Sequence, residues 1–166
     1  MDKPRPIMKV RVMSKNHFDK LLPRINVFDQ TVEEQNCAFI SIIGSDPEEK
    51  SYFNNDHPNV LRLVFDDITS EEKISMIKLG QSNRVLFCKE DAEKIIDFVD
   101  RNKDKYECFV HCAAGVSRSG AVGTFINDLC QYESFEAFAR SNSQIKPNFY
   151  ILAALRRVYN GMPLED

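Results

Sequence analysis

The sequence has no long apolar run, no concentrated basic stretch and no paired-cysteine motif, and each absence excludes a class of protein. None of its apolar segments approaches the roughly 20 residues that a membrane-spanning helix needs. The formal net charge is -3 without a long run of Lys or Arg, which argues against nucleic acid as a partner. Residues 1–6 lack the apolar stretch typical of a signal peptide. We therefore expect a protein that binds neither membrane nor nucleic acid.

The cysteines are scattered along the chain. The five are Cys37, Cys88, Cys108, Cys112 and Cys130. They form no Cys-x-x-Cys pair and no spacing typical of a metal site, and neither His17 nor His57 stands near a second plausible ligand. An odd number of cysteines without a secretion signal favours free thiols in a reducing compartment, and we expect the cytoplasm. The sequence predicts no metal and no cofactor.

Alternation of strand and helix patterns predicts the fold. Apolar, β-rich runs predict strands over residues 7–13, 37–43, 60–65 and 108–110. Periodicity and capping signals predict helices over residues 14–22 and 91–101, and helices that begin near residues 69, 118, 134 and 147. Pro23 is expected to end the first helix, and Pro147 to occupy the first position of the last one. This order predicts a single α/β domain over residues 1–166, with a central, largely parallel sheet of about 4–5 strands flanked by helices.

The most informative stretch covers residues 111–119 and reads HCAAGVSRS. Cys112 stands six residues before Arg118, with a glycine between them, and the stretch joins an apolar strand to a helix. A loop of this kind gathers backbone N–H groups at a helix N-terminus, which suits a tetrahedral dianion. The phosphate-binding residues are expected to be Ala113, Ala114, Gly115, Val116, Ser117 and Arg118. The pattern indicates a cysteine nucleophile that attacks phosphorus.

Each side chain of this loop has a chemical task in such a reaction. The loop N–H groups, the positive helix end and Arg118 favour the thiolate of Cys112. Gly115 lets the backbone turn and approach the anion without a Cβ atom. Arg118 offers a planar fork for two phosphoryl oxygens, and the Ser119 hydroxyl can donate a hydrogen bond to Cys112. A buried structural thiol is the ordinary role of a free cysteine, but it does not account for the Gly and Arg that follow Cys112.

The leaving alkoxide or phenoxide needs a proton from a general acid. Asp66 follows the strand predicted over residues 60–65, at the same edge of the sheet as the Cys112 loop. We therefore expect Asp66 to be the general acid, with Asp67 as the alternate. Either residue is also a typical turn former or helix cap.

The run over residues 111–120 resembles the signature loop of cysteine-based protein tyrosine phosphatases, and most of all that of the small dual-specificity branch. The resemblance extends from about Phe39 to Val158 and includes Pro147 and Asn148, a pair common near the C-terminus of that branch. It implies hydrolysis of phosphate monoesters on proteins through a phosphocysteine. Phosphotyrosine is the expected substrate group, with phosphoserine and phosphothreonine as further candidates.

The family's functional residues map onto this chain. The resemblance implies Cys112 as the nucleophile, Arg118 as the phosphate clamp, Ser119 as the hydroxyl that helps the thiolate leave, and Asp66 as the general acid. It further implies His111 and Asn148 as supporting residues. Two stretches depart from the family pattern. Residues 1–36 carry no family motif, and residues 79–91 form a longer connection than usual, either packed over the pocket or a surface insertion with one hydrophobic anchor.

Other functions are compatible with a loop of this kind. A phosphatase for an inositol lipid or an RNA 5′ end is one alternative, although lipid-specific relatives often carry Lys where this chain has Ala113 and Ala114. A non-catalytic phosphate-binding module is another, but it is expected to lack the Cys, the Arg or the acid. A sulfur-transfer or arsenate-reducing enzyme would not need Asp66. A phosphorylated protein or peptide is the expected partner.

Overall fold

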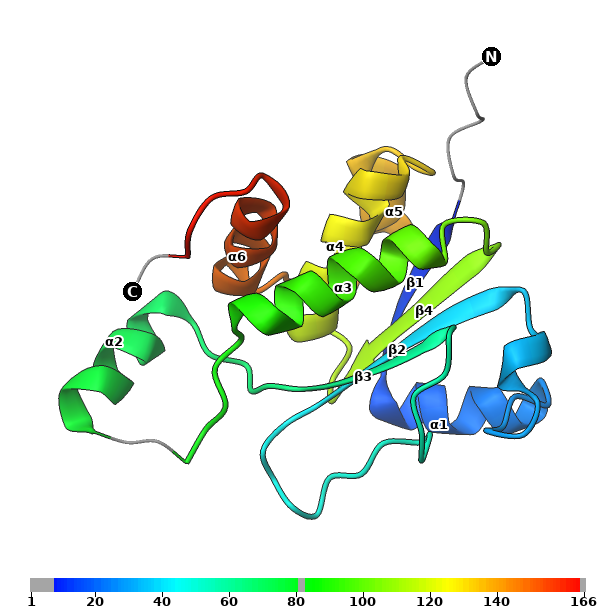
Figure 1. Cartoon of the computed structure of the whole chain (residues 1–166), viewed down its shortest axis with the longest axis horizontal. Coiled ribbons are helices and arrows are strands. Elements are labelled where there is room, and N and C mark those ends of the chain that lie inside the picture. The colour runs from blue at the N-terminus through cyan, green and yellow to red at the C-terminus, as the bar shows by residue number, and fades with distance from the viewer. Residues whose placement is uncertain (1–7, 81–82, 165–166) are drawn as a thin grey trace.

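A sheet of four parallel strands organises the structure (Figure 1). The computed structural model describes residues 8–80 and 83–164. The strands are β1 (Lys9–Ser14), β2 (Cys37–Ile43), β3 (Val60–Val64) and β4 (Glu107–Cys112), in the order β1-β4-β2-β3. The predicted α/β fold is confirmed, with the sheet at the lower end of the expected size. Residue 7, the first of the predicted strand over 7–13, lies outside the described residues.

Helices cover both faces of the sheet. Within the described residues they are α1 (Lys15–Arg24), a 3-10 turn (Val32–Glu34), α2 (Ser70–Leu79), α3 (Lys89–Arg101), α4 (Arg118–Cys130), α5 (Phe135–Ser141) and α6 (Phe149–Tyr159). Figure 1 shows α3, α4, α5 and α6 on one face and α1 on the other, while α2 lies apart from the sheet. α2 has no buried side chain, and its N-terminus is held by a capping box between Thr69 and Glu72.

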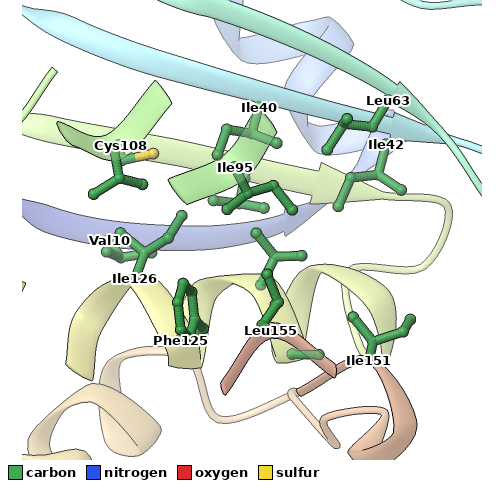
Figure 2. Close-up of a cluster of buried hydrophobic side chains, with 14 of the residues drawn as sticks. Val10, Ile40, Ile42, Leu63, Ile95, Cys108, Phe125, Ile126, Ile151 and Leu155 are labelled. Atoms are coloured by element: carbon green, nitrogen blue, oxygen red, sulfur yellow. The ribbon is translucent and has the colours of Figure 1, made fainter. Parts of the chain in front are cut away.

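Two hydrophobic cores result from the alternation of side chains along the strands. In the larger core, strand residues such as Val10, Ile40 and Leu63 face side chains of α3, α4 and α6, as Figure 2 shows. In the smaller core, Phe18 of α1 packs against Phe39 in an edge-on contact, with a centroid distance of 6.3 Å. Each fully buried side chain of this size stabilises the fold by about 1.5–3 kcal/mol.

The N-terminal residues belong to this same sheet. β1 pairs with β4 along its full length, from Lys9 opposite Glu107 to Ser14 opposite Cys112. Ser14 also caps α1, since its hydroxyl accepts a hydrogen bond from the amide of His17 at 3.1 Å. The segment without a family motif therefore supplies an edge strand that ends beside the predicted nucleophile.

Two predictions about proline were wrong. Pro23 lies inside α1, which runs on to Arg24, because a proline near the end of a helix forfeits only its own amide bond, and the amide of Ile25 still donates to Leu21 at 3.2 Å. Pro147 precedes α6 rather than opening it. Asn148 is the N-cap, because its side-chain oxygen accepts a hydrogen bond from the amide of Ile151 at 3.0 Å.

Candidate active site

The loop over residues 113–117 joins the carboxyl end of β4 to the N-terminus of α4 (Figure 1). In an open α/β sheet this edge is where ligands bind. Cys112 is the last residue of β4 and Arg118 is the first of α4, and both are buried. The strand–loop–helix arrangement predicted from residues 111–119 is confirmed.

The loop turns its carbonyl groups outward. Four loop carbonyl oxygens accept hydrogen bonds from neighbouring segments. The Lys15 amide donates to the Ala113 carbonyl at 3.1 Å, and Gln144 Nε2 donates to the Gly115 carbonyl at 3.2 Å. The Lys146 amide donates to the Val116 carbonyl at 2.9 Å, and the Asn148 amide donates to the Ser117 carbonyl at 3.0 Å. None of the backbone N–H groups from residue 113 to residue 117 donates a hydrogen bond to any described residue. A row of N–H groups without partners, at the N-terminus of a helix, is a cradle for an anion.

Gly115 is required by this geometry. Its φ angle is +74°, a conformation that favours glycine. A Cβ atom here would lie 2.4 Å from the backbone carbon of Met13 and from the amide nitrogen of Ser14. The end of β1 is therefore packed directly against the loop, and a side chain at this position would force the two apart.

The Cys112 thiol is at the base of the loop, close to a hydroxyl. Cys112 Sγ lies 3.0 Å from Ser119 Oγ, and both residues are almost completely buried. A thiolate can only accept a hydrogen bond, so Ser119 is the donor whenever Cys112 is ionised. The two residues meet in the way expected for a nucleophile and the group that assists its departure.

Arg118 uses one corner of its guanidinium to hold a neighbouring segment. Its Nη1 atom donates a hydrogen bond to the Phe65 carbonyl at 3.0 Å, which ties the loop to the end of β3. Nε and Nη2 have no hydrogen bond to any described residue. A guanidinium with this edge open can bind two oxygens of a phosphoryl group at once.

His111 supports the loop from beneath. The ring is completely buried, and Nδ1 lies 3.1 Å from the carbonyl oxygen of Cys112. Burial lowers the pKa of His111 to about 4, so the ring is neutral at neutral pH. Phe18 packs on the ring with a centroid distance of 4.3 Å.

Asp66 is occupied by structural hydrogen bonds. One carboxylate oxygen accepts from the amide of Ser45 at 3.0 Å, and the other from the amide of Val85 at 2.7 Å. Burial by itself raises the pKa of Asp66, but these amide donors outweigh burial and leave that pKa lowered. Such an environment stabilises the carboxylate, whereas a general acid must carry a proton.

Asp67 lies at the rim of the loop. Its Oδ1 atom accepts hydrogen bonds from Ser117 Oγ and from Asn148 Nδ2, each at 2.8 Å. Oδ2 takes none from the described part of the chain, and Asp67 is exposed to solvent. Asn148 also donates to the carbonyl of Ile68 at 3.1 Å, so one side chain connects this turn, the loop and the cap of α6.

The segment after α2 buttresses the Asp66–Asp67 turn. The Asp66 amide donates a hydrogen bond to the Val85 carbonyl, the Val85 amide donates to the Asp66 carboxylate, and Arg84 donates to the carbonyl of Asp67 at 3.0 Å. Phe87 is buried edge-on against Phe65, whereas Val85 is 39% exposed. Residues 83–91 thus match the interpretation of a surface segment with one hydrophobic anchor; residues 81–82 lie outside the described part.

Cys88 has a structural role in that segment. Its thiol donates to Asp91 Oδ2 at 3.2 Å at the N-terminus of α3. Burial is the largest factor that raises the pKa of Cys88, to about 11, so the thiol stays protonated at neutral pH. A protonated thiol is a poor nucleophile.

Three contacts of the site were not found from the sequence. Ser41 reaches His111 from β2, Gln144 reaches the Gly115 carbonyl, and the Lys15 amide reaches Ala113. For Ser41 the signal was a single hydroxyl in the apolar run CAFISII. The other two depend on which distant segments lie beside the loop, and no local pattern carries that information.

Over residues 8–80 and 83–164, no cluster of three or more His, Cys, Asp or Glu side chains is arranged to hold a metal ion. No helix in those ranges combines the length and hydropathy needed to cross a bilayer.

Solved structures that share this fold include a phosphatase. The PTP-2 phosphatase of Cydia pomonella matches with a TM-score of 0.51 and 16% identity, over 93% of this chain and 88% of that one. PTPMT1 in complex with PI(5)P matches with a TM-score of 0.50 and 16% identity, over 95% and 94% of the two chains. No family model and no curated protein matches the sequence. The chain has the protein tyrosine phosphatase fold that residues 111–120 predict.

Proposed function

We propose that this protein hydrolyses phosphate monoesters through a phosphocysteine formed on Cys112. The observation that carries the proposal is the loop over residues 113–117. Four of its five carbonyl oxygens accept hydrogen bonds from neighbouring segments, while none of its N–H groups donates to a described residue. These N–H groups and the open edge of Arg118 lie on the same strand–loop–helix unit as the Cys112 thiol, so they would hold a tetrahedral anion with its phosphorus next to the thiolate.

The first step transfers the phosphoryl group to sulfur. The Cys112 thiolate attacks phosphorus, the S–P bond forms, and the bond from phosphorus to the ester oxygen breaks. Arg118 and the loop N–H groups stabilise the charge on the three phosphoryl oxygens. The departing oxygen takes a proton from a carboxylic acid at the rim of the loop.

The second step returns the enzyme to its starting state. Water attacks phosphorus and gives a proton to the same carboxylate, and the S–P bond breaks to release inorganic phosphate. Ser119, 3.0 Å from Cys112 Sγ, donates a hydrogen bond to the thiolate that leaves. A stabilised thiolate is a better leaving group, so Ser119 assists this step.

We assign the general acid to Asp67, the alternate of the sequence-based prediction. Asp67 is fixed to the loop rim by Ser117 and Asn148 through Oδ1, which leaves Oδ2 to meet the substrate. Asp66 is the weaker candidate, because both of its oxygens accept backbone hydrogen bonds and its pKa is lowered.

The substrate class we propose is a phosphorylated protein or peptide in the cytoplasm. Ala113 and Ala114 are exposed and uncharged, so the loop offers no cation for a second phosphate. All five cysteines are free, as expected in a reducing compartment. The rival substrate is an inositol lipid, since a structure of similar fold is a complex with PI(5)P.

Steady-state rates on four substrates test the proposal. They are para-nitrophenyl phosphate, a phosphotyrosine peptide, a phosphoserine peptide and PI(5)P in neutral vesicles, with Cys112→Ser as the inactive control. We expect turnover of the aryl phosphate and the highest kcat/KM on the phosphotyrosine peptide. A higher kcat/KM on the lipid would overturn the protein substrate, and equal rates for Cys112→Ser and wild type would overturn the mechanism.

A further inference from the structure

A chain of hydroxyl groups leads from the loop after β2 to the base of the candidate active site. Ser41 Oγ lies 2.6 Å from His111 Nε2, and Ser51 Oγ lies 3.0 Å from Ser41 Oγ. Ser41 is opposite His111 in the register of β2 and β4, and only 1% of its surface is exposed. A buried hydroxyl on an otherwise apolar strand is costly unless it is hydrogen-bonded, so this contact needs an explanation.

The hydrogen bonds of this series can have only one set of donors and acceptors. The Cys112 carbonyl can only accept, so His111 Nδ1, 3.1 Å away, must carry the ring proton. Burial lowers the pKa of His111 to about 4, so the ring is neutral and Nε2 is an acceptor. Ser41 must therefore donate to Nε2, and Ser51 must donate to Ser41. In the opposite tautomer, the lone pair of Nδ1 would face the carbonyl oxygen.

We propose that Ser41 is a positioning residue, which holds the His111 ring so that Nδ1–H stays on the Cys112 carbonyl from which the catalytic loop departs. Ser41 touches neither substrate nor thiol. Its effect on catalysis rests on the phosphatase function proposed above. The Cys112 carbonyl sets the orientation of the first peptide unit of the loop, and the loop N–H groups converge only if that unit is held.

Ser51 extends this link to a separate segment. It is half-buried in the connection between β2 and β3, residues 44–59, which packs Phe53 against α1. The amide of Gly44, at the start of this connection, donates to Glu49 at 2.9 Å. The same connection therefore contacts the end of β2 and, through Ser51 and Ser41, the ring beneath the loop.

Nuclear magnetic resonance of the imidazole nitrogens tests the proposal directly. The chain has three histidines, so the His111 signals can be identified by comparison with His17 and His57 variants. We expect wild-type His111 at neutral pH to carry its proton on Nδ1. A proton on Nε2 would overturn the proposal. This measurement uses wild-type protein, so it does not depend on whether a variant folds.

The variants then connect the position of the ring to turnover. In Ser41→Ala, the Cys112 carbonyl still keeps the proton on Nδ1, but the ring loses its second hydrogen bond. We therefore expect the Nδ1 proton to exchange faster with water and kcat for para-nitrophenyl phosphate to fall about tenfold. Ser41→Thr keeps a hydroxyl and should restore both the slow exchange and most of kcat. The matched control is Cys37→Ala, which trims the same face of the same strand and should change neither.

The outcomes separate this proposal from the proposed function. Unchanged Nδ1 proton exchange in Ser41→Ala, or faster exchange with wild-type kcat, would overturn the positioning role while the phosphatase activity stands. If wild-type protein does not hydrolyse para-nitrophenyl phosphate, the proposed function fails, and the exchange measurement still reports whether Ser41 holds the His111 ring.

Discussion

At the scale of the residue, the proposed function gives Arg118 two tasks with one guanidinium. Nη1 holds the carbonyl of Phe65 at the end of β3, and the opposite edge is open for a phosphoryl group. A lysine ammonium at this position keeps the charge, but it cannot serve the carbonyl and two phosphoryl oxygens together. The shape of the side chain therefore matters as much as its charge.

Arg118→Lys should accordingly lower kcat/KM for para-nitrophenyl phosphate by about 100-fold or more. The control is Arg140→Lys, an exposed arginine on α5, which should leave kcat/KM unchanged. Steady-state kinetics and a thermal unfolding curve would be measured for both variants. A lysine variant with near-normal turnover would mean that Arg118 does not clamp the phosphate.

The two neighbouring aspartates are distinguished by the leaving group. Asp67→Asn should lower kcat by about 100-fold for phenyl phosphate but much less for an activated aryl ester, because a good leaving group departs without a proton. Asp66→Asn should lower stability and affect both esters by a similar factor, since it disturbs the bonds to Ser45 and Val85. Rates on a series of aryl phosphates decide between them. Leaving-group dependence confined to Asp66→Asn would reverse the assignment.

The sequence could not choose between these two residues. Asp66 and Asp67 follow the same strand, and the turn that places one beneath the segment over residues 83–87 and the other at the loop rim depends on distant partners. By contrast, the placement of Cys112, Arg118 and Ser119 around the loop follows from spacing alone. A strand, a tight glycine turn and a helix leave little freedom in where those three side chains point.

At the scale of the element, caps decide where the helices begin. Thr69 and Ser134 were predicted as helix starts from the sequence, and both are N-caps in the structure. The start of α6 was misplaced by two residues, because a proline signal was given more weight than the asparagine after it. That asparagine also holds Asp67, so the cap of α6 is part of the candidate site.

Asn148→Ala should therefore lower both stability and turnover. Loss of an N-cap costs about 1 kcal/mol of unfolding free energy, and release of Asp67 should lower kcat for phenyl phosphate. Ser134→Ala is the matched control, because it removes the cap of α5 without a contact to the loop. Urea unfolding and steady-state kinetics would be measured for both. If the two variants lose the same small fraction of kcat, Asn148 acts only as a cap.

At the scale of the whole molecule, two histidines give opposite dependences of stability on pH. Burial lowers the pKa of His111 to about 4, below the value of about 6.5 in an unfolded chain. Hydrogen bonding to Asp29 raises the pKa of His57, and Glu33 adds to this effect. The unfolded chain thus binds more protons than the folded one at His111, and fewer at His57.

The His111 contribution should appear as a loss of stability on acidification. The contribution of His111 to the unfolding free energy should fall by up to about 3 kcal/mol from about pH 6.5 down to pH 4, and stay constant below that pH. The His57 contribution is present at low pH and is lost as pH rises through its raised pKa. Urea unfolding from about pH 4 to pH 8, with His57→Gln as comparison, measures both. A variant curve parallel to wild type on the alkaline side would contradict the role of His57.

Long-range packing could not be predicted from the sequence. Every strand and α-helix of the described residues was predicted, because hydrophobic periodicity and caps are local, whereas the 3-10 turn over Val32–Glu34 was not. The covered edge of β1 was not, although it contacts the site. Asn142 and Gln144 bond the backbone of Val12 there, and Gln144 continues to Gly115. Side-chain amides from a later segment can replace a missing neighbouring strand, and no local sequence pattern predicts this replacement.

The central claim is that phosphate is transferred to Cys112, and trapping the phosphoenzyme tests it most directly. In Asp67→Asn, an activated ester should still phosphorylate the thiolate, whereas the water attack that needs a base should be slow, so the intermediate accumulates. The reaction with para-nitrophenyl phosphate is quenched in acid, and its peptides are analysed by mass spectrometry. The account predicts one phosphoryl group on the peptide that contains Cys112, and none in the double variant that also carries Cys112→Ser. Continued turnover of the ester with no phosphoryl group on Cys112 at any quench time would contradict it.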